Sequence, residues 1–121
     1  MIRSIVAASA CGLALLAMAA VAPAASPIKG AKYKGSVEGG QAKVILRVSD
    51  TGKRLKFVLR CYGTTAVKKS RVPIDDDGKF EFNKPYFTAT GKFVKRKKAK
   101  GSISGNACLL PSTASWTATK T

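Results

Sequence analysis

The chain has 121 residues and a formal net charge of +16, from 22 Lys and Arg against 6 Asp and Glu. This length fits one small domain and excludes a second, catalytic one. The sequence contains no histidine, which excludes histidine-based catalysis and histidine metal ligands. Such an excess of positive charge predicts a preference for negatively charged partners.

The first residues have the pattern of a secretory signal peptide. Arg3 provides a short positive start, and the apolar run that follows ends at the small residues Ala22-Pro23-Ala24. We predict cleavage after Ala24. The alternative is a membrane anchor, but an apolar run of about 17 residues is at the lower limit for crossing a hydrocarbon core of ~30 Å.

This reading divides the chain into a signal peptide, residues 1–24, and a secreted β domain, residues 25–121. Cleavage would leave a net charge of +15 and no transmembrane span. The expected location is outside the cell, in the periplasm or on the cell envelope.

Two cysteines remain in the predicted mature chain, Cys61 and Cys108. An exported small domain lies in an oxidising compartment, where two such cysteines usually pair. Closing a loop of this length would remove unfolded-chain entropy worth ~4 kcal/mol. A thiol redox site is the alternative, but the Cys-x-x-Cys spacing is absent. We therefore predict a Cys61–Cys108 disulfide.

Apolar and polar residues alternate along most of the mature chain, which predicts short strands. Turn residues separate these runs at Asp50–Lys53 and at Asp75–Gly78. No segment has the spacing of an amphipathic helix. The expected strands are a first one from about Lys32 and then residues 42–48, 55–61, 79–82, 91–94, 101–104 and 115–119. We predict an all-β antiparallel sandwich or open barrel of seven or eight short strands, closed by the disulfide.

Some local motifs resemble those of small, uncharacterised secreted bacterial β-sandwich domains. The shared features are the turn Asp77-Gly78-Lys79-Phe80, the late Cys108 and the terminal Trp116-Thr117-Ala118, together with Gly91-Lys92-Phe93 and residues 99–103. The resemblance covers about residues 30–119. It implies a disulfide-closed β-sandwich and carries no function with it.

The most unusual segment is a basic run formed by Lys95, Arg96, Lys97, Lys98 and Lys100. If Phe93 and Ile103 face each other across a hairpin, this run is its tip. Each Lys or Arg near an anionic surface contributes about 1 kcal/mol of attraction. We therefore predict that the run binds anions. The alternative is a solvated loop that maintains solubility and discourages edge pairing.

The only acidic cluster is Asp75-Asp76-Asp77. Three adjacent carboxylates lack the alternating ligand spacing of a calcium loop. We expect a turn or a counter-charge for lysines, with weak calcium binding as the alternative. Without histidine, no nucleophile with an evident base and no opposed carboxylate pair is apparent. We expect a non-enzymatic protein without a cofactor.

The aromatic residues are expected mainly in the core. Alternation assigns the inward face to Phe57, Phe80, Phe82 and Phe93, and Trp116 is expected inside as well. Tyr33, Tyr62 and Tyr86 are expected in the core, with a sugar- or base-stacking face as the alternative. No motif of sequence-specific nucleic-acid recognition is present.

Two classes of function follow. The first is a secreted domain that binds anionic envelope polymers or surfaces electrostatically through Lys95–Lys100. Candidate partners are teichoic acids, lipopolysaccharide phosphates, acidic polysaccharides and extracellular nucleic acid. The second is a structural or protein-partner module, or an inhibitor of an extracellular enzyme, in which the basic charge is incidental.

Overall fold

The computed structural model describes residues 25–39, 42–105 and 113–121. This part of the chain forms eight antiparallel strands, and no helix in it is long and apolar enough to cross a membrane. The strands are β1 (Lys32–Val37), β2 (Ala42–Val48), β3 (Arg54–Cys61), β4 (Thr64–Pro73), β5 (Lys79–Lys84), β6 (Phe87–Lys95), β7 (Lys98–Gly105) and β8 (Thr113–Lys120).

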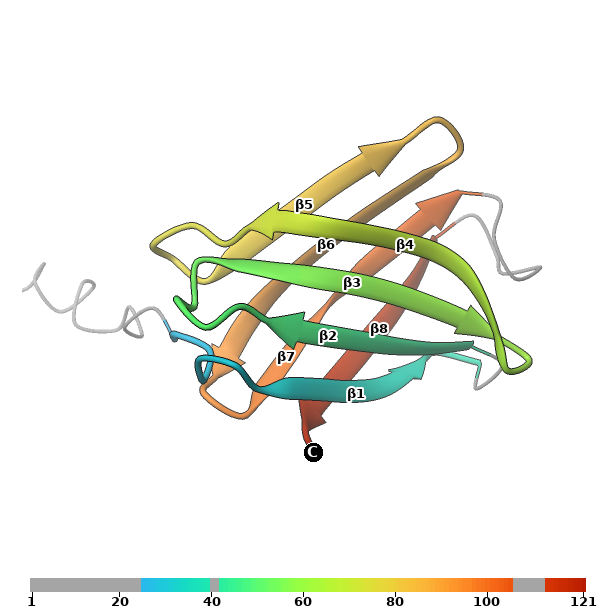
Figure 1. The fold of residues 1–121 in the computed structure, drawn as a ribbon. Coiled ribbons are helices and arrows are strands. Elements are labelled where there is room, and N and C mark those ends of the chain that lie inside the picture. Colours follow the sequence, from blue (N-terminus) through green and yellow to red (C-terminus); the bar gives the residue numbers. More distant parts are fainter. Residues whose placement is uncertain (1–24, 40–41, 106–112) are drawn as a thin grey trace, which may run out of the picture.

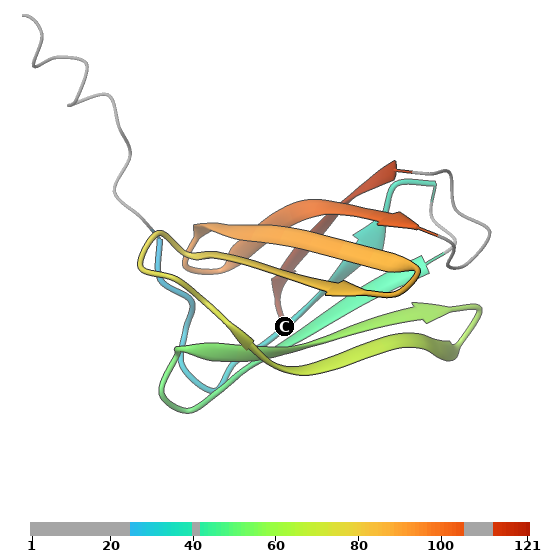
Figure 2. The same cartoon turned by 90° about the horizontal axis from the view of Figure 1, so that it is seen from above.

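The strands form one sheet in the order β4-β3-β2-β1-β8-β7-β6-β5. All consecutive strands pair with each other except β4 and β5, which are the two ends of the sheet, and β1 also pairs with β8. The sheet curls until β4 and β5 approach each other, so that β1–β4 and β5–β8 become two layers (Figures 1 and 2). The all-β prediction is confirmed, and the form is a nearly closed barrel.

The core inside the barrel is formed by the side chains at alternate positions of most strands. In β2, the inward positions Ala42, Val44, Leu46 and Val48 are buried, while Lys43 and Arg47 are exposed. β3 repeats this pattern, and it pairs with β2 from Val48↔Leu55 to Ala42↔Cys61. A shift of one residue would turn every apolar side chain outward, so burial fixes this register.

Strand β4 was absent from the sequence prediction because its apolar residues do not alternate. Its two buried residues, Val67 and Val72, are five positions apart and so belong to opposite faces of a regular strand. One register shift, between the Leu55 and Phe57 pairings, adds a residue to β4 between the two valines and brings both inward; a second shift follows between Leu59 and Arg60. Arg71 has a φ of 58° within one of these irregular stretches. Bulges of this kind bend a strand and are common at sheet edges.

A row of four residues crosses β5, β6, β7 and β8 in the middle of the core. The register places Phe80 opposite Gly91, Gly91 opposite Gly101, and Gly101 opposite Trp116. A Cβ on Gly91 would lie 2.4 Å from Cζ of Phe80 and 2.6 Å from Cζ2 of Trp116. Gly91 therefore makes room for two aromatic rings, whose centroids are 6.0 Å apart.

Candidate anion-binding face

The predicted basic run does not form a long hairpin tip. β6 continues to Lys95 and β7 begins at Lys98, so only Arg96 and Lys97 form the turn. The condition for a long tip, that Phe93 faces Ile103, is not met: Phe93 lies opposite Ala99, and Ile103 lies opposite Ala89. Ala99, between Lys98 and Lys100, has a small side chain that is buried in the core. β7 therefore begins at Lys98, inside the basic run, rather than after it.

The turn is fastened to the neighbouring strands of the barrel. The buried Tyr33 hydroxyl accepts a hydrogen bond from the Ile28 amide at 3.0 Å and donates one to the carbonyl oxygen of Arg96. The Lys120 amide donates to the carbonyl oxygen of Lys97 at 2.9 Å. Tyr33 is thus a core residue, as expected.

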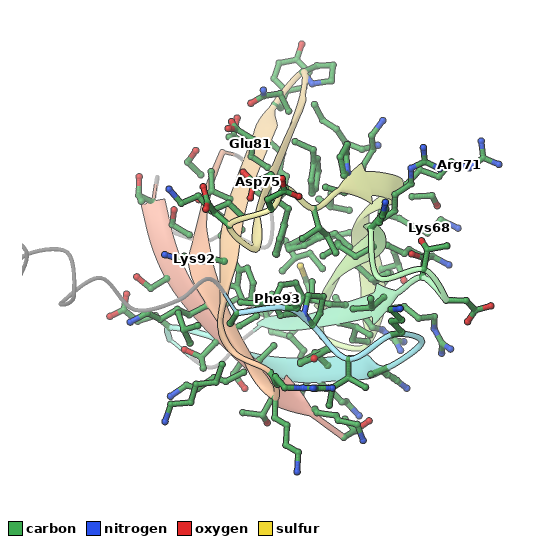
Figure 3. All side chains as sticks on the ribbon, turned by 90° about the vertical axis from the view of Figure 1, so that its left-hand side faces the viewer. Lys68, Arg71, Asp75, Glu81, Lys92 and Phe93 are labelled. Atoms are coloured by element: carbon green, nitrogen blue, oxygen red, sulfur yellow. The ribbon has the colours of Figure 1, made fainter. Side chains whose placement is uncertain are left out.

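The five cations of the run are all exposed. They do not share one surface: Lys100 faces a hollow of about 540 Å³ on the outside of β5–β7, which it shares with Lys79 and Lys92. The carboxylates of Asp75 and Glu81 line the same hollow. Figure 3 shows Asp75, Glu81 and Lys92 on this layer, with Lys68 and Arg71 on the β4 side. Positive charge in this hollow is therefore partly offset.

The strands of the other layer carry charge of one sign only. Every charged residue within the strands β1–β4 is Lys or Arg. We use the name basic face for the outward surface of β1–β3, whose cations are Lys32, Lys34, Lys43, Arg47, Arg54, Lys56 and Arg60. Each of these side chains points outward because its neighbours in the strand are part of the core.

The strand register places five of these cations directly opposite one another. Lys32 lies opposite Arg47 and Arg47 opposite Lys56, which makes a row of three cations across three strands. Lys43 lies opposite Arg60 in the same way. Facing residues in a sheet have Cβ atoms about 5 Å apart, and like charges at this distance destabilise the pairing. The basic face therefore concentrates positive charge at a cost in folding free energy.

Two adjoining hollows lie on the basic face, and no carboxylate lines either of them. The larger has a volume of about 600 Å³ and the smaller about 250 Å³. Lys32, Ile45 and Arg60 line both. Ile45 lies opposite Val58, so two half-buried aliphatic side chains form a small apolar floor surrounded by cations.

The β3–β4 turn closes one side of the larger hollow. Cys61 pairs with Thr64, so the turn consists of Tyr62 and Gly63, with φ angles of 52° and 81°. The Arg60 guanidinium donates a hydrogen bond from Nη2 to the carbonyl oxygen of Gly63 at 2.5 Å. The Tyr62 side chain is 68% exposed and lines the hollow. The expectation of a core position is therefore wrong for Tyr62, and also for Tyr86, which is 76% exposed.

The acidic cluster forms a turn. The Asp75 carboxylate accepts hydrogen bonds from the amides of Asp77 and Lys79 at 2.8 Å and 2.9 Å, and the Gly78 amide donates to the Asp75 carbonyl oxygen. One carboxylate is therefore engaged by the backbone. No group of three potential metal ligands occurs within the described ranges.

Cys61 ends β3 on the inward face and is 9% exposed. Its predicted partner, Cys108, lies outside the described residues, as do residues 1–24. The segment that contains Cys108 connects β7 to β8, between Gly105 and Thr113. Because strand direction alternates around the barrel, the end of β7 at Gly105 and the start of β8 at Thr113 lie at the same end as Cys61.

The basic face could not be predicted from contiguous charge, because its cations are not adjacent in the chain. Lys43, Arg47 and Arg60 are separated along the chain by apolar residues. A signal was nevertheless present, because the outward positions of the two best-defined strands are mostly cationic. Only the pairing of β1, β2 and β3 shows that these positions face one another.

No family model, curated protein or solved structure matches this chain. The resemblance to small secreted bacterial β-sandwich domains stays a prediction.

Proposed function

We propose that this protein is a non-enzymatic, exported β domain that binds anionic polymers of the cell envelope. The binding surface is the basic face, and the turn Arg96–Lys97 adds positive charge at the end of the barrel. This differs from the sequence-based hypothesis in the place of the site, which moves from the basic run to the outer surface of β1–β3.

The observation that carries the proposal is the row Lys32, Arg47 and Lys56, with Lys43 and Arg60 beside it. Facing cations weaken a sheet, and nothing on this layer's strands offsets them. A bound polyanion would supply the missing counter-charge. A solubilising role alone would be served equally well by cations scattered apart from one another.

Binding to anionic polymers is expected to weaken steeply with salt. A site that engages three or more anionic groups should lose about 20-fold or more in affinity between 50 and 200 mM salt, by analogy with counterion release from nucleic acids. The measurement is a salt-titrated binding screen across teichoic acid, lipopolysaccharide, single-stranded DNA and a neutral glycan. Equal affinity for the neutral glycan, or affinity that is independent of salt, would contradict the proposal.

Export and the Cys61–Cys108 disulfide are part of the proposal. The position of Cys61 at the end of the barrel where β7 ends and β8 begins supports the pairing. We expect the intact mass of the exported, unreduced protein to be two hydrogens below that of the reduced form. Reduction should cost about 2–4 kcal/mol of unfolding free energy. Two thiols that react freely with an alkylating reagent in the folded, unreduced protein would refute the pairing.

A further inference from the structure

The larger hollow of the basic face holds an exposed aromatic ring as well as cations. Tyr62 lines it together with Lys34, Lys43 and Arg60, and Ile45 contributes the apolar floor. We propose that this hollow binds a sugar ring that carries anionic groups. The ring stacks on Tyr62, and its anionic groups contact the three cations. This inference rests on the proposed function and identifies the polymer as an anionic polysaccharide.

The backbone at Tyr62 is the first independent support. A two-residue hairpin turn with positive φ at both positions favours Asn, Asp or Gly, because a Cβ is crowded there. Tyr62 has a φ of 52°, which is unusual for a bulky residue. Unfavourable backbone conformations of this kind concentrate at ligand sites. Tyr62 is too exposed for its ring to repay this cost through core packing.

The second support is the position of Arg60. Its guanidinium holds the Gly63 carbonyl oxygen and so fixes the turn that carries Tyr62. The same residue lines both hollows and lies opposite Lys43. Arg60 and the backbone that carries Tyr62 are therefore joined in one hydrogen-bonded unit of strand and turn, which reduces the entropy lost when a ligand is bound.

A sugar fits this arrangement better than a nucleic-acid base. Proteins that bind single strands use several aromatic platforms in succession. On the basic face, Tyr62 is the single aromatic residue among the described outward positions of β1–β3 and their β3–β4 turn. Its neighbour Ile45 offers an aliphatic surface, which suits the C–H groups of a pyranose ring. The surrounding lysines and Arg60 suit phosphate, sulfate or carboxylate substituents.

The test compares Tyr62→Asn with the wild type. Asn accommodates positive φ, so the variant removes the ring without weakening the turn. The probes are a sulfated oligosaccharide, an oligouronate and a polymer of phosphorylated sugars, with polyphosphate as an anion that has no sugar ring. We expect Kd to rise about fivefold or more for the saccharide that fits and to stay unchanged for polyphosphate.

Two further variants control for exposure and chemistry. Tyr62→Phe keeps the ring and should retain binding to the same saccharide. Tyr86→Asn removes an equally exposed tyrosine that lines none of the hollows described above, and it should have no effect. If Tyr62→Asn leaves every affinity unchanged, the sugar subsite is refuted and the proposed function stands. An equal loss for polyphosphate or for single-stranded DNA refutes the sugar ring as the ligand. Absence of wild-type binding to all anions refutes both.

Discussion

Neutralising the row Lys32, Arg47 and Lys56 with Gln should weaken binding to anionic polymers by about 100-fold at low salt. Each lost cation removes about 1 kcal/mol of attraction near an anionic surface. The three side chains lie opposite one another on β1, β2 and β3, so a polymer that crosses the strands contacts all of them. The measurement is Kd by titration at 50 mM salt or below.

The chain provides a matched control on the opposite layer. Lys79, Lys92 and Lys100 form an equivalent row across β5, β6 and β7, and their replacement by Gln removes the same charge. Asp75 and Glu81 share their hollow, so we expect the control to lose less than about fivefold. Equal losses for the two rows would show that net charge, rather than the basic face, determines binding.

The variant that replaces Lys32, Arg47 and Lys56 also distinguishes a role in binding from a role in folding, when its unfolding free energy is measured. Removing two direct like-charge contacts should raise the unfolding free energy by about 1 kcal/mol at low salt. In the control row the lysines also lose their attraction to nearby carboxylates, so the net change should be close to zero. A face variant that binds less and is more stable would indicate that the basic face is retained for binding. Unchanged or reduced stability would refute the electrostatic cost inferred from the register.

Gly35→Ala should be among the most destabilising single substitutions in this chain. Gly35 lies opposite Ala118, where β1 pairs with β8 and joins the two layers. A Cβ at this position would lie 1.6 Å from the carbonyl oxygen of Thr117 and 2.6 Å from the Ala118 Cα atom. Both are main-chain atoms, so relief requires the strands to separate. We expect a loss of about 3 kcal/mol or more.

Denaturation followed by tryptophan fluorescence measures this loss. Trp116 is the only tryptophan and is 1% exposed, so its emission reports the opening of the core. The control is Ser36→Ala, because Ser36 is the next residue and points outward. Its effect should stay within about 0.5 kcal/mol. An equally small effect of Gly35→Ala would show that β1 and β8 have room to separate without loss of the fold.

Strands with regular alternation could be predicted from the sequence. Residues 42–48 and 55–61 were expected as strands with a shared apolar face, and β2 and β3 occupy nearly these ranges. Alternation can be read from a short stretch of sequence, because successive side chains of a strand point to opposite faces of the sheet and one face lies on the core. Local patterns failed where pairing disturbs them, as in β4, where one register shift brings both Val67 and Val72 inward.

The candidate anion-binding face could likewise be predicted only in part from the sequence. Composition alone determined that the chain is strongly basic, and alternation determined that Lys43 and Arg47 point away from the core. Only the tertiary structure decided that these cations meet others on β1 and β3, because pairing between strands brings together residues that are distant in the chain. It also separated Lys100 from the basic face and placed it beside Asp75 and Glu81. The sequence determines the number and sign of the charges, but the register of strand pairing determines the distances between them.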